Sequence, residues 1–332
     1  MLEDLNLHTE FMLYHSAMPA IGALVSYRIA EHLETGPKSV EELASLASIS
    51  SSRLFRYLRL SSYFQVFAFD SDSHKWANTK RSLILTSSLS RSLWELVSHP
   101  KLIENYVHAT SLLASDREPF EIKNTPNPFE VFAQNPDLLS KFQKNMTELT
   151  KNTLKNVIDN IDIGDSKKVL DVGGADGSLV LGIVKKHDLI KGGIMERPEV
   201  EPIANLNISE NGLSERVQFH EGNFFESITE GYDCIVMKHI IHDWNDEKAS
   251  LILKNCRKVL KEGDKVFIVD MVVDINSEFY PNNLAMDFLM LVVLGAKERT
   301  IEEFGKLFSE NGFRLNSVKR FSDEAIIEAV AV

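Results

Sequence analysis

The sequence predicts an α/β protein built from two domains, a mainly helical one over residues 1–115 and a doubly wound α/β one over residues 116–332. Three observations predict this fold. Apolar residues up to about residue 115 recur almost throughout at the period of a helix. Four prolines and several asparagines between residues 118 and 136 indicate a connection between domains. From residue 167 onward, short apolar runs alternate with helical patterns, which is typical of βαβ units and a parallel sheet.

The N-terminal region carries few strand signals. Its helix-period segments cover residues 11–13, 20–33, 40–47 and 54–60. Strand-like patterns follow at residues 64–69 and 75–77, with turn-forming residues 70–73 between them. Two short helices followed by a two-stranded ribbon are the order of a winged helix-turn-helix.

The C-terminal region alternates strands and helices. Its strand-like runs are VLDVGG, GGIM, VQFHEG, DCIVMK and VFIVDMVV. Helical patterns begin at Ser178, after the first run, and at Asp246, after the fourth. This alternation predicts that ligands bind at the carboxyl ends of the strands. One more amphipathic helix is predicted before the sheet, over residues 138–158.

Composition excludes several classes of protein. A formal net charge of −12 argues against a general polyanion binder, because neutralising many phosphates needs an excess of Lys and Arg. Cys234 and Cys256 lack metal-like spacing and are expected to be buried, reduced thiols. The N-terminus lacks the pattern of a signal peptide, and no apolar run reaches the roughly 18 residues of a membrane span. We therefore expect a cytoplasmic protein that binds neither nucleic acid nor a membrane.

A glycine-rich turn, running from Asp171 to Gly177, lies between the first predicted strand and its helix. Glycines let the backbone pass close to a bound nucleoside. The spacing differs from the dinucleotide fingerprint, which needs glycine where this chain has Ala175 and Ser178. Glu196 ends the next predicted strand, where an acidic side chain can accept hydrogen bonds from both ribose hydroxyls. Taken alone, the turn is also compatible with a plain tight turn.

Several longer segments extend this pattern: DVGGADG, GGIMERPEV, RVQFHEGNFF, YDCIVMKHIIHDWNDEKA and MDFLMLVVLGAKERTIEEF. In order and spacing they resemble the small-molecule O-methyltransferases dependent on S-adenosylmethionine, which include plant caffeic acid and isoflavone methyltransferases, hydroxyindole methyltransferases and many microbial relatives. The resemblance covers nearly the whole chain, and the His-Asp-Trp triplet is its most specific piece. It implies a Rossmann-like class I methyltransferase domain, a winged-helix dimerisation domain before it, and a homodimer.

The resemblance also implies roles for residues at matching positions. S-adenosylmethionine would be the methyl donor, S-adenosylhomocysteine the product, and no metal would be required. The positions that match the cofactor site are Asp171, Gly173, Gly174, Gly177, Glu196, Arg197, Asn223, Phe224 and Lys238. His242 matches the catalytic base, and Asp270 and Glu298 match the two acids that hold it. The positions that match the acceptor pocket are Phe142, Met146, Met286, Leu289, Met290 and Val293.

These residue types suit methyl transfer to a hydroxyl. A phenol has a pKa of about 10 and is a poor nucleophile until its proton is removed, for which an imidazole with a pKa of ~6.5 is suited. Carboxylates beside the ring fix its orientation and stabilise the imidazolium, as in a Ser-His-Asp triad. His239, three residues earlier, is expected at the strand end or the cofactor rim. Methionine and aromatic stripes are often plain core, but together the acceptor residues indicate an apolar pocket for an aromatic or polyketide-like molecule.

The sequence departs from the family pattern in three places. Ala175 stands where the family usually has a third glycine, Asn223 where it has an aspartate, and Glu196-Arg197-Pro198 where it has Asp-Leu-Pro. Alanine adds one methyl group, which a slight backbone shift can absorb. Asn223 still offers a hydrogen bond to adenine but no charge, so a lower affinity for the cofactor is expected.

Two alternatives remain open on the sequence alone. Some proteins of this fold bind S-adenosylmethionine but catalyse hydroxylation, decarboxylation or pericyclic reactions; the presence of the complete His-Asp-Glu set favours methylation. A winged helix can also read DNA, and the helix predicted near residues 51–62 carries Arg53, Arg56 and Arg59 on one face. The alternative is that these arginines pair with acids across a dimer interface or stay solvated.

Overall fold

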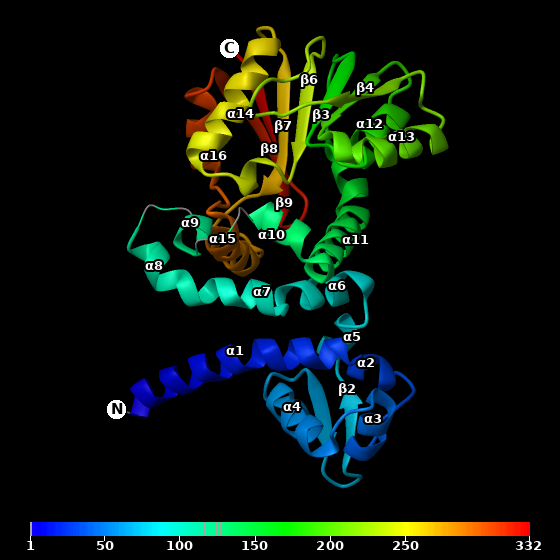
Figure 1. Ribbon diagram of the computed structural model, residues 1–332, viewed down its shortest axis with the longest axis vertical. Helices are drawn as coiled ribbons and strands as arrows, with labels where there is room; N and C mark the ends of the chain where they lie inside the picture. Colours follow the sequence, from blue (N-terminus) through cyan, green and yellow to red (C-terminus); the bar gives the residue numbers. More distant parts are fainter. Residues whose placement is uncertain (1, 116, 118, 124, 126–127) are drawn as a thin grey trace. The chain divides into compact units, whose positions relative to one another are not determined.

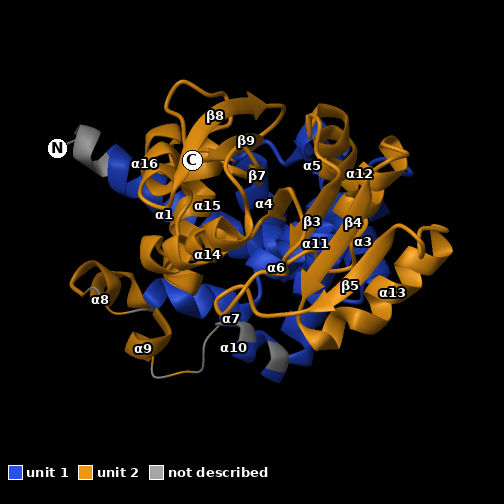
Figure 2. Ribbon diagram, turned by 90° about the horizontal axis from the view of Figure 1, so that it is seen from above, with its two compact units in different colours: residues 1–107, 129–150 blue, residues 108–128, 151–332 orange. Residues whose placement is uncertain are grey.

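The computed structural model describes residues 2–115, 117, 119–123, 125 and 128–332. The chain falls into two compact units, residues 1–107 with 129–150 and residues 108–128 with 151–332 (Figure 2). The predicted boundary between the domains lies at residue 116, outside the described residues, so the division into 1–115 and 116–332 stays a prediction.

The first unit is mainly helical (Figure 1). Its helical segments are α1 (Leu2–Ser26), α2 (Ile29–His32), α3 (Val40–Ala47), α4 (Ser51–Tyr63), α5 (Lys80–Ile84), α6 (Ser88–Val97), α7 (Pro100–Ile103), and most of the short η1 (Glu104–His108), α10 (Pro128–Gln134) and α11 (Pro136–Asn160). After α3 and α4, an antiparallel ribbon forms from β1 (Phe67–Asp70) and β2 (Lys75–Asn78). The predicted order of two helices and a ribbon is confirmed.

Local signals explain how this unit folds. The Ser39 hydroxyl accepts from the N–H of Glu42 at 3.2 Å, and the Glu42 carboxylate accepts from the N–H of Ser39 at 2.7 Å. This capping box satisfies N–H groups that the first turn of α3 leaves without helical partners. Apolar faces of α1 to α4 and of the ribbon then form one core, in which Ile29, Leu43 and Leu58 are fully buried.

The segment predicted as a connection between domains, residues 118–136, is helical over much of its described length, and the chain passes from the second unit to the first within it, between residues 128 and 129. α9 (Pro119–Lys123), α10 and α11 each begin at a proline. Proline suits the first position of a helix, because its missing N–H has no partner there and its φ is already helical. These prolines start helices. α9 belongs to the second unit, as does α8 (Ala109–Leu113).

The second unit is built on a seven-stranded sheet with the order β5-β4-β3-β6-β7-β9-β8. The strands are β3 (Lys168–Val172), β4 (Lys191–Glu196), β5 (Val217–Glu221), β6 (Cys234–Lys238), β7 (Lys265–Met271), β8 (Phe313–Arg320) and β9 (Glu324–Ala331). β3 to β7 pair in parallel, as predicted, with Leu170 opposite Ile235. β9 pairs antiparallel with both β7 and β8, and this hairpin is absent from the sequence predictions.

Helices cover both faces of this sheet, which confirms the doubly wound α/β fold (Figure 1). One face packs against α12 (Ser178–Lys186), α13 (Glu201–Glu210) and the end of α11, the other against α14 (Asp246–Val259) and α16 (Ile301–Ser309). Val169 packs on the face covered by α12 and α13, and Leu170 on the face covered by α14 and α16, because successive strand residues point to opposite sides of a sheet. The remaining helical segments are η2 (Pro198–Val200), η3 (Ile241–Asp243) and α15 (Tyr280–Leu294).

The strand order reverses between β3 and β6. β4 and β5 continue the sheet on the side of β3, and β7 continues it on the side of β6. Such a reversal is the topological switch point at which open α/β sheets bind ligands. The residues that follow the two strands, 173–177 and 239–242, meet there, since a Cβ on Gly173 would lie 2.4 Å from Cδ1 of Ile240.

Two further predictions concern the cysteines and membrane association. Cys234 in β6 and Cys256 in α14 are buried and carry free thiols, as expected. Burial raises the pKa of the Cys256 thiol to about 12. Within the described part of the chain, no helix combines the length and the apolar character needed to cross a bilayer.

Candidate active site

The glycine-rich turn after β3 needs glycine at two positions. Gly173 has a φ of +72° and Gly177 a φ of +80°, both in the left-handed region. A Cβ on Gly173 would lie 2.4 Å from Cδ1 of Ile240, and a Cβ on Gly177 would lie 2.2 Å from Cδ1 of Ile194. The turn therefore packs directly against the residues after β6 and against β4, with no space for a side chain.

Ala175 and Glu196 complete this turn. Ala175 has a φ of +45°, a left-handed conformation that costs a residue with a Cβ about 1–2 kcal/mol. Its N–H donates to Oε2 of Glu196 at 3.3 Å, and the N–H of Arg197 donates to Oε1 at 2.9 Å. These bonds fix the half-buried Glu196 carboxylate at the end of β4, and each of its oxygens can still accept another hydrogen bond. Arg197 is exposed and lies 3.8 Å from Glu199.

Asp171 lies below the turn rather than at its surface. It is 2% exposed, and its Oδ2 accepts from the N–H of Val180 in α12 at 3.3 Å. A Cβ on Gly174 would lie 2.7 Å from Cγ of Asp171. Burial raises the pKa of Asp171 to about 7, although the Val180 N–H acts in the opposite direction. These contacts support the turn from beneath, and a direct contact of Asp171 with a cofactor stays a prediction.

Two predicted cofactor residues lie in the segment after β5. Phe224 is half-buried, and its Cε1 would lie 3.8 Å from a Cβ on Gly173, which places the ring beside the turn. Asn223 is exposed, and both ends of its amide are engaged locally. Its Oδ1 accepts from the N–H of Phe225 at 3.1 Å, and its Nδ2 donates to Oε1 of Glu226 at 2.9 Å. A contact of Asn223 with adenine stays a prediction.

Lys238, the last predicted cofactor residue, belongs to a buried ionic cluster. Its Nζ lies 3.3 Å from Oε1 of Glu324, and the same oxygen lies 2.7 Å from Nε2 of His239. Glu324 begins β9 and is 1% exposed. Burial lowers the pKa of Lys238 and lowers that of His239 to about 4, which keeps His239 neutral at pH 7. The ring of His239 stacks on that of His242, with centroids 5.2 Å apart.

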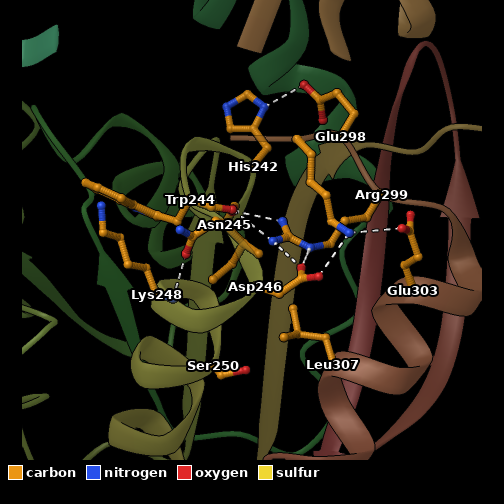
Figure 3. A network of polar contacts seen from close by, with 12 residues as sticks. His242, Trp244, Asn245, Asp246, Lys248, Ser250, Glu298, Arg299, Glu303 and Leu307 are labelled. Atoms are coloured by element: carbon orange, nitrogen blue, oxygen red, sulfur yellow. Dashed lines mark hydrogen bonds and ion pairs between the residues drawn. The ribbon is translucent and has the colours of Figure 1, made fainter. Parts of the chain in front are cut away.

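His242 is held by two acids from other parts of the fold. Its Nδ1 lies 2.8 Å from Oε1 of Glu298, in the segment after α15 (Figure 3). Its backbone N–H donates to Oδ2 of Asp270, in β7, at 3.2 Å. An ionised carboxylate only accepts, so the ring hydrogen at this contact lies on Nδ1. On the other side of the ring, Nε2 lies 3.6 Å from Oδ1 of Asp243. The structure thus brings together the three residues predicted to be catalytic.

These acids set the charge of His242. Burial lowers the pKa of His242. The charges of Glu298 and Asp270 and the hydrogen bond to Glu298 raise it by more than burial lowers it, so the resulting pKa is about 10. Burial raises the pKa of Asp270 to about 7 and that of Asp243 to about 6, and the charge of His242 opposes both shifts. Oδ1 of Asp270 and Oε2 of Glu298 are buried and have no hydrogen-bond partner among the described residues.

The predicted acceptor residues fall in different units. Four of the six share one face of α15 in the second unit: Met286, Leu289, Met290 and Val293. All four are buried or half-buried. Phe142 and Met146 lie on α11 in the first unit, where Phe142 stacks on Phe132 with centroids 4.9 Å apart. A single pocket lined by all six residues stays a prediction.

Sequence reasoning missed two acids of this site. Asp243 follows His242 directly in the His-Asp-Trp triplet, so the motif itself could have indicated an acid beside the histidine. Glu324 lies 86 residues from Lys238, in a hairpin without a clear sequence pattern. No motif around Glu324 indicates that it belongs to the site. Within the described ranges, no group of three or more His, Cys, Asp or Glu side chains is arranged to hold a metal ion.

Comparisons with known proteins bear on this geometry. Residues 108–314 match the model of a family described as an O-methyltransferase domain. The phenazine O-methyltransferase PhzM of Lysobacter antibioticus is 28% identical over 91% of this chain and 89% of its own. The structure of the mitomycin 7-O-methyltransferase MmcR has a TM-score of 0.86 at 23% identity, and covers 100% of this chain and 98% of that one. NcsB1, an O-methyltransferase solved with S-adenosylmethionine and 2-hydroxy-5-methyl naphthoic acid, has a TM-score of 0.79 at 23% identity, with 95% and 96% covered.

Proposed function

The chain belongs to the family of S-adenosylmethionine-dependent O-methyltransferases, whose domain model matches residues 108–314, and on this premise we propose its acceptor and its base. The acceptor is a small aromatic or polyketide-like molecule with a free hydroxyl. His242 is the general base that removes the hydroxyl proton. One observation carries the proposal: Glu298 holds the His242 ring at 2.8 Å, at the switch point where the glycine-rich turn also lies.

The contact with Glu298 fixes what His242 can do. With the ring hydrogen on Nδ1, the lone pair of the neutral imidazole lies on Nε2, where it can accept the proton of a hydroxyl. The charges of Glu298 and Asp270 then stabilise the imidazolium that forms. The raised pKa of His242 is near the ordinary pKa of a phenol, about 10, so a proton passes between the two groups at little cost in free energy.

The residues around the turn fit the methyl donor. S-adenosylmethionine, when bound, supplies a methyl carbon made electrophilic by a positively charged sulfur. The turn at Gly173 allows close approach of a nucleoside, Glu196 would accept hydrogen bonds from the ribose hydroxyls, and Phe224 would flank the adenine. The carboxylate of Glu298, close to the switch point, favours a cationic ligand through its charge. No metal enters the proposed reaction.

The class of acceptor follows from α15 and from the relatives. The face of α15 that carries Met286 and Met290 is apolar and half-buried, and thioether side chains adapt to irregular or flat partners. Relatives named for the methylation of phenazine and mitomycin, and the naphthoic acid bound to NcsB1, support an aromatic or polyketide-like molecule.

The experiment that tests this function replaces the base. His242→Gln should lower turnover of a phenolic acceptor by ~10² or more, because proton transfer to a positioned base contributes about that much. Binding of S-adenosylmethionine, measured by calorimetry, should remain. The control is His187→Gln, at the other end of α12 from the glycine-rich turn, which should alter neither quantity. Undiminished turnover in folded His242→Gln would contradict the role of the base.

We also propose that two copies associate through the first unit, as the family resemblance implies. Large apolar side chains of α1 are exposed on a single chain, among them Phe11 at 62%, Met12 at 70% and Tyr14 at 56%. Several large apolar side chains exposed within one turn of a helix favour an interface with another chain. Sedimentation equilibrium should give the mass of a dimer, and Phe11→Asp combined with Met12→Asp should dissociate it. A wild-type protein that sediments as one chain would contradict this proposal.

A further inference from the structure

We propose that Arg299 is a positioning residue, which fixes the turn that carries His242 relative to the carboxylate of Glu298 (Figure 3). Its consequence for methyl transfer rests on the proposed function, whereas the placement of the ring does not. Arg299 directly follows Glu298 and is not among the residues predicted from the sequence to form the site. Three properties of Arg299 support this role: the hydrogen bonds of its side chain, the pairing of its backbone and its burial.

The Arg299 guanidinium holds the turn on both sides of His242. Nη1 donates to the backbone carbonyl of Ile241 at 3.0 Å, and Nη2 donates to that of Trp244 at 2.8 Å. Nε and Nη2 also donate to Oδ1 of Asp246, the first residue of α14, at 3.0 and 2.8 Å. Because a guanidinium is planar, it holds these acceptors in one fixed arrangement.

The backbone of Arg299 is joined to the strand that carries Asp270. Arg299 forms a parallel bridge with Val272, directly after β7, and its carbonyl accepts from the N–H of Val273 at 3.0 Å. One residue therefore connects three parts of the site: the turn through its side chain, the strand through its backbone, and the acid that holds the ring through its peptide bond.

Stability alone does not account for this arginine. Its side chain is among the largest fully buried ones, with 1% of the residue exposed. Taking a guanidinium out of water is costly, and a buried ion pair is often no more stabilising than apolar side chains of the same volume. The partner, Asp246, keeps 60% of its side chain exposed, so water screens much of the attraction. The four hydrogen bonds instead hold the turn that carries His242 in a single geometry.

The chain offers a matched control in Arg216. Its guanidinium also donates to backbone carbonyls, those of Val184, His187 and Ile190. Arg216 directly precedes β5, at the amino ends of the parallel strands, whereas the site lies at their carboxyl ends. Lysine at either position keeps the charge but loses the planar set of donors.

The test compares Arg299→Lys with Arg216→Lys. NMR of 15N-labelled histidine, titrated with pH and assigned with His242→Gln, reports the pKa of His242. The charged and titratable groups that face this ring are Glu298, Asp270, Asp243 and His239. In Arg299→Lys the turn is released and the contact with Glu298 loosens, so the pKa of His242 should fall by about one unit or more. Turnover should fall about tenfold or more, with unchanged binding of S-adenosylmethionine. Arg216→Lys should alter none of these quantities.

The outcomes separate this proposal from the proposed function. An unchanged titration of His242 in folded Arg299→Lys overturns the positioning role, whatever happens to turnover. Full turnover of His242→Gln overturns the base but leaves the titration valid. If Arg299→Lys shows no cooperative thermal unfolding, Asp246→Ala takes its place, since it removes the exposed carboxylate that accepts from Nε and Nη2 of Arg299. A lowered pKa of His242 in Asp246→Ala then supports the proposal, and an unchanged one overturns it.

Discussion

Nδ1 of His242 lies 2.8 Å from Oε1 of Glu298, although 56 residues separate the two in the chain. Their side chains are 11% and 0% exposed, so water screens the charge of the carboxylate poorly. The contact therefore determines the orientation of the ring, the location of its hydrogen and the pKa of the imidazole.

Glu298→Gln tests the charge in this contact. The amide keeps the size of the side chain and can still accept a hydrogen bond from Nδ1, but it cannot stabilise an imidazolium by charge. We expect turnover to fall about tenfold or more, and the pKa of His242 to fall as well. The exposed Glu302, in the first turn of α16, supplies the control Glu302→Gln. Equal turnover in the two variants would show that the charge is dispensable.

The pH dependence of the activity follows from the same pair. His242 must be neutral to accept a proton, and the neighbouring acids raise its pKa to about 10 without ligands. We expect kcat/KM for the acceptor, at saturating S-adenosylmethionine, to rise with pH through the neutral range, where the raised pKa keeps most of His242 protonated. The plateau should begin below 10, because a cationic ligand nearby disfavours the imidazolium. A profile that is flat from about pH 7 to 9 would argue against His242 as the base.

The free energy of unfolding should depend on pH through the same histidine. The folded-state pKa of His242, about 10, lies above its unfolded value of about 6.5. The stabilising contribution is complete below the unfolded value and is lost as the pH rises through the folded value. The stability difference between wild type and His242→Gln, from urea unfolding, should therefore shrink between about pH 7 and 10. A constant difference over this range would mean that folding does not raise the pKa.

Gly173→Ala should weaken binding of S-adenosylmethionine by about tenfold or more, equivalent to ~1.4 kcal/mol. The alanine would combine a left-handed backbone with a Cβ 2.4 Å from Ile240. Gly212 has a similar φ of +67°, but a Cβ there would meet no described atom within 4 Å. Gly212→Ala thus isolates the backbone strain, about 1–2 kcal/mol, and should lower Tm without changing the affinity. Calorimetry measures the affinity of each variant and thermal unfolding its Tm. If Gly173→Ala and Gly212→Ala bind S-adenosylmethionine equally well, the close approach at Gly173 has no role in binding.

Glu196→Gln should lower the affinity for S-adenosylmethionine tenfold to about a hundredfold, because hydrogen bonds to a charged acceptor contribute roughly 1.5–3 kcal/mol. Glu221 is the control, since it lies opposite Glu196 in the register of β4 and β5 and ends the neighbouring strand. Glu221→Gln changes the same charge at the same edge of the sheet. If both variants lose the same affinity, Glu196 acts through the general field and not through a direct contact.

Local pattern predicts those elements whose own residues specify them. α3 occupies the predicted residues 40–47, and α12 and α14 begin where predicted, because caps and apolar periodicity act within a few residues. β9 escapes this reasoning. Its sequence, EAIIEAVA, has two glutamates and three alanines, residues with low strand propensity, and it forms a strand because β7 and β8 pair with it from both sides.

The site divides in the same way. The His-Asp-Trp triplet and the glycine-rich turn are local, so the sequence indicates them, and the resemblance supplies Asp270 and Glu298. Glu324 reaches Lys238 across 86 residues and Arg299 reaches Asp246 across 53, which only the folded chain reveals. The conformation of Ala175 likewise depends on a distant partner, the carboxylate of Glu196.

β9 lies between β7 and β8, inside the sheet, although it follows both in the sequence. During synthesis on the ribosome, β7 therefore presents an open apolar border until β9 has emerged from the exit tunnel. A nascent chain at that stage is exposed to association with other unfinished chains through this border. It already holds the turn and the histidine, but Glu324 has not yet met Lys238 and His239. Pairing of β9 thus both closes this border and brings Glu324 to Lys238 and His239.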